Sequence, residues 1–153
     1  MSTRETRIAR VVELRDQRLK LAVLALEEAR AVHTKAQHDL SSAQTLRLDA
    51  ERARRELSKT GTDIRSFIEA EEWLRARAVE EEMCGLRLRQ AKGAFDKGQQ
   101  RVKDAAIKLR QLQQLQERLR QARRTKETRA ERSAEDEIGQ RAAQSERSRK
   151  REA

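Results

Sequence analysis

The chain has 153 residues, of which 41% are charged and 2% aromatic, and it carries a formal net charge of +10 with five glycines and no proline. Tight turns need residues with a positive or preset φ, so this composition argues against sandwiches, barrels and doubly wound sheets. Ala, Glu, Lys, Leu and Arg make up 93 of the residues, a share typical of long helices and coiled coils. Because high charge with low hydrophobicity also describes disordered chains, the spacing of the apolar residues has to decide between the two.

The first predicted element is a helix over about residues 5–58. From Ile8 to Ala43, positions spaced alternately four and three residues apart are apolar in nine of eleven cases. This spacing predicts a coiled-coil seam. Beyond Ala43 the apolar residues move by one position, which predicts a stammer and a seam that continues through Leu46, Ala50, Ala53 and Leu57.

Residues 59–62 are predicted to form a turn. Gly61 can take the left-handed conformation that ends a helix, and Thr62 or Asp63 can cap the next helix by accepting hydrogen bonds from its free N–H groups. A short connection of this kind makes the two helices antiparallel neighbours.

The second predicted helix covers about residues 63–125. Its seam runs from Phe67 to Leu119 with the same spacing, and twelve of its sixteen positions are apolar. The predicted fold is therefore all-α, with residues 1–125 forming one long antiparallel two-helix coiled-coil hairpin. If Leu57 lies near Ile64, the residue numbers of any two facing positions on the two helices add to about 121. The first helix then ends opposite about residue 113, and residues 113–126 are expected to project beyond the N-terminus.

The last predicted segment, residues 126–153, loses the apolar stripe and carries eight basic and seven acidic groups. We expect this charged tail to be frayed, or to be a helix that becomes ordered on a partner.

Motifs for catalysis are missing from the sequence. It contains no phosphate-binding GxxxxGK[ST] loop, and His33 and His38 are five residues apart rather than four. His33 and Cys84 fall on seam positions, where we expect them to pack. We therefore expect no enzyme activity, no catalytic, cofactor-binding or metal-binding residues, and no cofactor. The absence of an apolar run long enough for a membrane or a secretory signal predicts a cytoplasmic protein.

Basic residues gather where the chain termini are expected to lie. Mixed charge along a long helix usually marks a solvated face, but this end is strongly positive and would attract an acidic surface. The candidate partner-binding residues at this end are Arg4, Arg7, Arg10, Arg118, Arg120, Arg123 and Arg124.

An apolar group follows the predicted turn, at the other end of the hairpin. Phe67 lies on the seam, whereas Ile68 and Trp73 lie partly off it. Trp is enriched at interface hot spots, so these three residues are candidates for a partner contact. Packing within the hairpin tip is the alternative.

The size, the basic termini, the hairpin position and the opening segment from Ile8 to Arg18 together resemble the YscO/FliJ family of bacterial type III secretion. The resemblance implies a central stalk whose terminal end enters the hexameric secretion ATPase and whose hairpin end reaches the export-gate protein at the inner membrane. It implies secretion chaperones as further partners and a monomer in isolation. The lack of tyrosine favours the injectisome branch over the flagellar one.

Two other functions remain open from the sequence. A nucleic-acid-binding coiled coil would use the same arginines on phosphates, although no aromatic residues accompany them for base stacking. A self-assembling scaffold would pair hairpins through Ile68 and Trp73. The stalk interpretation expects no nucleic acid as a partner.

Overall fold

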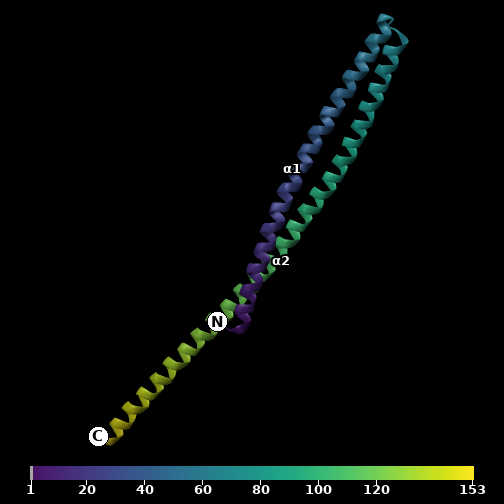
Figure 1. Cartoon of the computed structure of the whole chain (residues 1–153). Helices are drawn as coiled ribbons and strands as arrows, with labels where there is room; N and C mark the ends of the chain where they lie inside the picture. The colour runs from purple at the N-terminus through teal and green to yellow at the C-terminus, as the bar shows by residue number, and fades with distance from the viewer. Residues whose placement is uncertain (1) are drawn as a thin grey trace. The chain divides into compact units, whose positions relative to one another are not determined.

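The computed structural model describes residues 2–153, which form two α-helices, α1 (Thr3–Thr60) and α2 (Ile64–Glu152), and no strand (Figure 1). The chain divides into two compact units. The hairpin unit is Gln17–Ala106, and the terminal unit combines the residues up to Asp16 with Ile107–Ala153. In each unit α1 packs against α2, which confirms the all-α helical hairpin.

The turn of the hairpin unit uses the predicted residues but covers only positions 61–63, because α1 continues to Thr60. Gly61 has a φ of 67°, and no other described residue has a positive φ. The Asp63 carboxylate accepts a hydrogen bond of 3.2 Å from the Ser66 N–H, which caps the start of α2. The Thr62 hydroxyl donates to the Leu57 carbonyl at 2.9 Å and satisfies the end of α1. These bonds reverse the chain within three residues.

The core of the hairpin unit is narrow and made of small side chains. Its buried residues are Ala36, Ala43, Ala50, Cys84 and Ala91, and they alternate along the two predicted seams. Every seam position from Phe67 to Leu119 is buried or half-buried. Small residues let two helices approach closely, but each one removes little apolar surface from water. The second predicted seam is thus confirmed.

The predicted stammer in α1 is wrong. Leu46 is 40% exposed and Ala53 is exposed, whereas Arg47 and Arg54 are half-buried. The seam therefore keeps its four-three spacing past Ala43. The arginines occupy these positions because α2 supplies acidic partners for both of them across the seam.

Arg47 donates a hydrogen bond to Glu81 on α2 and another of 2.6 Å to Glu51 on its own helix. The hydrogen bond and the charge of Glu81 raise the pKa of Arg47. Arg54 pairs with Glu71 at 2.9 Å, and its guanidinium also lies 5.7 Å from the centre of the Phe67 ring. Both arginines therefore cover the narrow core with their stems and place their charges at its edge.

The predicted pairing of facing residues is also wrong, by about one helical turn or more. The His33 ring stacks on Phe95 with the ring centres 5.6 Å apart, where the predicted pairing places Leu88. A Cβ atom at Gly98 would lie 3.2 Å from Cδ1 of Leu26, where Phe95 was expected. The helices pair further along α2 because α1 continues to Thr60 before the turn and α2 begins only at Ile64.

In the terminal unit, the start of α1 lies beside α2 (Figure 1). The Ser2 hydroxyl accepts a hydrogen bond of 3.2 Å from the Glu5 N–H, and Leu109 on α2 is buried. Gln116 and Leu119 line a common hollow with Ile8. The expectation that residues 113–126 project beyond the N-terminus is therefore wrong for their first ten positions or so.

Beyond Arg123, helix α2 continues without a neighbour. Residues 124–152 lie on this helix, and the final Ala153 is not helical. All residues from 124 to 153 are exposed. The structure gives this segment a helical conformation, and its order in the absence of a partner stays a prediction. Neither described helix contains a stretch long and apolar enough to cross a membrane.

Candidate partner-binding surfaces

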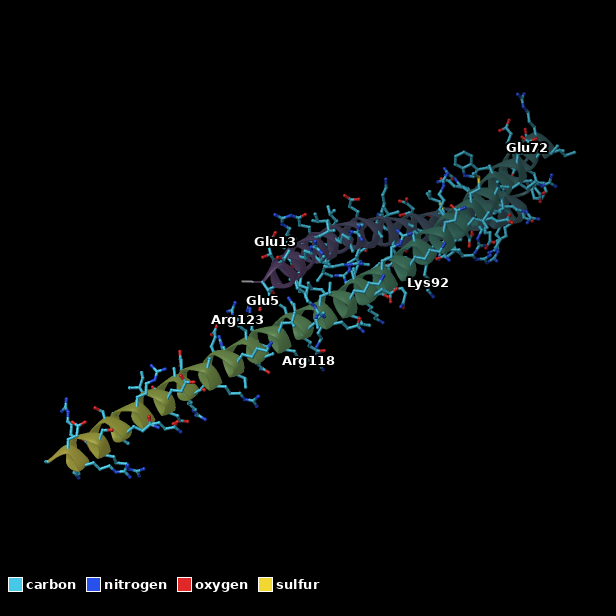
Figure 2. The ribbon with its side chains drawn as sticks, turned by 90° about the horizontal axis from the view of Figure 1, so that it is seen from below. Glu5, Glu13, Glu72, Lys92, Arg118 and Arg123 are labelled. Atoms are coloured by element: carbon cyan, nitrogen blue, oxygen red, sulfur yellow. The ribbon has the colours of Figure 1, made fainter. Side chains whose placement is uncertain are left out.

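An ion pair links the two helices of the terminal unit. Arg123 Nη1 donates to Glu5 Oε2 at 3.0 Å, and the Glu5 side chain is only 14% exposed (Figure 2). Arg123 Nε lies 3.6 Å from Glu127 Oε1, and this nitrogen is buried without a hydrogen bond. Arg123 therefore acts first as a link between α1 and α2, rather than as a free cation.

A small hollow of about 90 Å³ lies next to this ion pair, with Ile8, Ala9 and Leu119 in its wall. Arg120 and Arg123 form part of its rim. An apolar hollow edged by guanidinium groups suits an acidic partner segment with an apolar side chain, since the partner gains contact area as well as charge pairing.

The remaining six candidate arginines of this unit are exposed and make no ion pair within residues 2–153. The structure thus brings the predicted basic cluster into one unit and separates it into one linking arginine and six free ones. The free residues are Arg4, Arg7, Arg10, Arg118, Arg120 and Arg124. Guanidinium groups of this kind bind carboxylates and phosphates with paired hydrogen bonds.

Trp73, in the hairpin unit, is 55% exposed. The Arg77 guanidinium lies over its indole ring at 4.2 Å from the centre, and Arg77 also donates to Glu80 at 2.9 Å. The cation orients the ring and leaves its other face open to solvent. An ordered and half-exposed indole is a suitable anchor for a partner protein.

Ile68 and Phe67 lie elsewhere on α2. Five residues along a helix turn a side chain by about 140°, so Ile68 and Trp73 point to different sides. Ile68 is 50% exposed, and with Phe67 it lines a hollow of about 200 Å³. Phe67 itself is half-buried on the seam. The three predicted residues therefore form two separate apolar sites rather than one patch.

A larger groove was not expected from the sequence. It has a volume of about 480 Å³ and lies between the helices over Ala36, Cys84 and Ala91, with Val32 exposed at its edge. The signal in the sequence is the run of small residues on both seams, because small side chains leave space that larger ones would fill. Cys84 packs at its floor, as a buried free cysteine.

No group of three or more His, Cys, Asp and Glu side chains in residues 2–153 is arranged to hold a metal ion. Most titratable groups lie along exposed helix faces, and outside the arginine network the pKa of Asp63 is shifted. Its pKa is lowered, mainly because the carboxylate accepts hydrogen bonds from Ser66.

The family model described as the flagellar FliJ protein matches residues 4–148, which is nearly the whole chain. The chain belongs to the FliJ family. FliJ-family proteins are non-catalytic stalk proteins of flagellar and type III export, and they associate with the export ATPase and the export apparatus. No curated protein and no solved structure matches the chain at a significant level. The general role of this FliJ-family chain is therefore in protein export.

Proposed function

We propose that the chain is the central stalk of a bacterial type III export ATPase, with its terminal unit inside the hexameric ring. The observation that carries this proposal is the difference between Arg123, which is paired within the unit, and the other candidate arginines, which are not. Arg123 binds Glu5 and holds the two helices together, while six other arginines of the unit are exposed and unpaired. A rigid pair of helices with free guanidinium groups is suited to a ring whose inner surface is acidic or polar.

The hairpin end supplies the second contact in this proposal. Trp73, oriented by Arg77, and Ile68 beside Phe67 offer two apolar anchors for the cytoplasmic part of the export-gate protein. The stalk would then transmit nucleotide-driven changes in the ring to the gate. It would be cytoplasmic and associate peripherally with the inner-membrane apparatus, with secretion chaperones as further partners. The ATPase, and not this chain, would supply the catalysis.

The export system in question is proposed to be an injectisome. The support for this branch is the absence of tyrosine from the chain, since surface aromatic residues serve gate contact in the flagellar branch.

Capture of the export ATPase from the native bacterium tests the terminal contact. The variant is Arg118→Glu with Arg120→Glu and Arg124→Glu, which spares Arg123 so that the helix pair stays intact. The matched control reverses three exposed and unpaired arginines of the hairpin unit, Arg55, Arg87 and Arg101. We expect the wild type and the control to recover the ATPase and the variant to lose it.

Two results would contradict the proposal. Failure of the wild-type chain to recover an export ATPase would remove the stalk role. Equal loss in both triple variants would show that only net charge matters. If the wild type instead recovers nucleic acid, and binding to any duplex falls steeply with salt, the nucleic-acid function is favoured.

A further inference from the structure

Helix α2 carries a second apolar stripe that its own hairpin does not use. Val79, Met83 and Leu86 follow one another at intervals of four and three residues, which places them on one face of the helix. They are 56%, 49% and 51% exposed. Leu86 follows the buried Cys84 by two residues, about 200° around the helix, so this stripe faces away from the seam.

Exposed apolar residues scattered singly are ordinary, but a regular row on one helix face indicates a contact with another element. No part of residues 2–153 covers this row, because α1 packs on the opposite side of α2. The occupant of the stripe must therefore come from another molecule.

Unpaired charges flank the stripe in a specific order. Glu82 lies near its middle, Arg89 lies seven residues further on, and Asp96 lies another seven beyond that. All three lack an ion-pair partner among the described residues, although most acidic groups nearby have one. Arg75, seven residues before Glu82, has only a long contact of 3.9 Å to Glu71. The signs thus alternate along one edge of the stripe at intervals of two helical turns.

The surface beside these charges is hollowed. A groove of about 330 Å³ lies between α2 and Leu40 of α1, and its lining on α2 includes Glu82, Gly85, Leu86 and Arg89. A Cβ atom at Gly85 or at Gly93 would meet no atom within 4 Å. The surface therefore has room for a side chain of another helix next to Leu86.

We propose that two copies of the chain associate through this face, with their α2 helices antiparallel and Leu86 of each copy next to the two-fold axis. In this arrangement Glu82 lies opposite Arg89 of the second copy, and Arg75 lies opposite Asp96 of the second copy. Val79 lies opposite Gly93 of the second copy, where the missing side chain admits it. A single two-fold axis thus covers the apolar stripe and also places both pairs of opposite charges next to each other.

The alternating charges favour a second copy over an unrelated partner. When a second α2 helix runs antiparallel beside this edge, each of its basic residues lies opposite an acidic residue of the first copy, and the reverse. A parallel pairing in register would set Glu82 against Glu82 and Arg89 against Arg89. A contact made by one helix of each copy falls at the small end of specific interfaces, below about 1,200 Å², so the dimer is weak and reversible. It revises the expectation of a monomer, which came from the stalk role and not from the residues.

The proposal does not depend on the stalk function. The stripe lies entirely in the hairpin unit, whereas the contact with the ATPase is assigned to the terminal unit. A reversible dimer would describe the free chain, and it would dissociate wherever a single hairpin enters the ring.

Sedimentation of the full chain over a range of concentrations tests the dimer. We expect the average mass to rise from 17.8 kDa toward twice that value as the concentration increases. Leu86→Glu should abolish the rise. Leu24→Glu is the matched control, since Leu24 on α1 is 56% exposed and lies outside the stripe. It should associate like the wild type, and circular dichroism should show unchanged helicity for both variants.

Charge reversal tests the register. Glu82→Arg alone should weaken association by at least tenfold, because it sets arginine against Arg89 twice in the dimer. Adding Arg89→Glu should restore it. A wild-type mass of one chain at all concentrations would overturn the proposal, as would a Leu86→Glu variant that still associates or a double variant weaker than the single one. None of these results bears on capture of the ATPase, so the two proposals fail separately.

Discussion

Glu5 and Arg123, separated by 118 positions in the sequence, form the ion pair that joins the first turns of α1 to α2. The acceptor is almost covered, with 14% of the Glu5 side chain exposed, and the donor is 40% exposed. The start of α1 thus depends on a contact near the place where α2 begins to run without a neighbour.

Glu5→Gln should loosen the start of α1. Because the pair is partly exposed, we expect a loss of about 0.5–1 kcal/mol in local stability, and faster hydrogen exchange confined to the first three turns of α1. Amide exchange measured by mass spectrometry would report it. Glu127→Gln is the control, since Glu127 contacts the same arginine only at 3.6 Å. Equal effects of the two changes would contradict the assigned link.

Glu81→Gln should destabilise the hairpin unit. The change removes the negative charge that faces the half-buried Arg47 across the seam, and the pKa of Arg47 is raised chiefly by its hydrogen bond to Glu81. Arg47→Leu should destabilise the unit less, because leucine fits a seam position and buries apolar surface, which offsets the loss of the ion-pair partner of Glu81. Thermal unfolding of both variants would measure the effect. A lower melting temperature for Arg47→Leu than for Glu81→Gln would contradict the structure.

Gly61→Ala should destabilise the chain by about 1 kcal/mol, because an alanine with a φ of 67° is strained. Gly93→Ala is the control with the opposite sign. A Cβ atom there meets nothing within the chain, and alanine favours the helix by about 0.5–1 kcal/mol. Urea unfolding at low chain concentration, where association is negligible, would compare the two. A stabilising effect of Gly61→Ala would exclude the left-handed turn.

Acid should weaken the cap at Asp63. The folded state lowers the pKa of this carboxyl from its usual value of 3.8, so its charged form contributes stability above that pH. That contribution is lost as the pH falls through the lowered pKa. Asp63→Asn keeps a capping side chain without a titrating group. We expect the melting temperature of the wild type to fall relative to this variant below about pH 4, and a constant difference between them would contradict the cap.

Trp73→Ala and Ile68→Ala should each reduce binding of the chain to the cytoplasmic part of the export-gate protein. Loss of an anchoring aromatic residue typically costs 2 kcal/mol or more, so we expect a fall of about thirtyfold in affinity for Trp73→Ala. Leu24→Ala should leave binding unchanged. Because Ile68 and Trp73 face different sides of α2, an effect of only one of them would show which side meets the gate.

The charged segment 126–152 should exchange its amide hydrogens much faster than the rest of α2 in the free chain. All of it is exposed, and helices without tertiary contacts are marginal in water. Addition of the export ATPase should slow this exchange if the segment becomes ordered on its partner. Strong protection in the free chain would contradict the expected fraying.

The two seams, the glycine turn and the exclusion of a sheet could all be derived from the sequence. Each is a local property, since it depends on residue spacing within one helix or on the conformation of one glycine. The stammer was derived in the same way and was wrong. Apolar spacing favoured Leu46 and Ala53, but Glu81 and Glu71 on the other helix stabilise Arg47 and Arg54 at the seam positions.

The candidate sites divide in the same manner. The sequence identified the basic cluster and the apolar residues after the turn, because residue type and position along the chain are enough to locate them. It could not show that Arg123 is already bound to Glu5, or that the Arg77 guanidinium lies over the Trp73 ring.

By itself, then, the sequence determined that this protein is a pair of long helices joined at Gly61. Helical periodicity and turn conformation depend on residues that are close together in the sequence. Only the tertiary structure decided which residues of the two helices face each other. Small alanine side chains pack almost equally well in pairings one turn apart, so the choice falls to contacts between distant residues, such as Arg47 with Glu81 and His33 with Phe95.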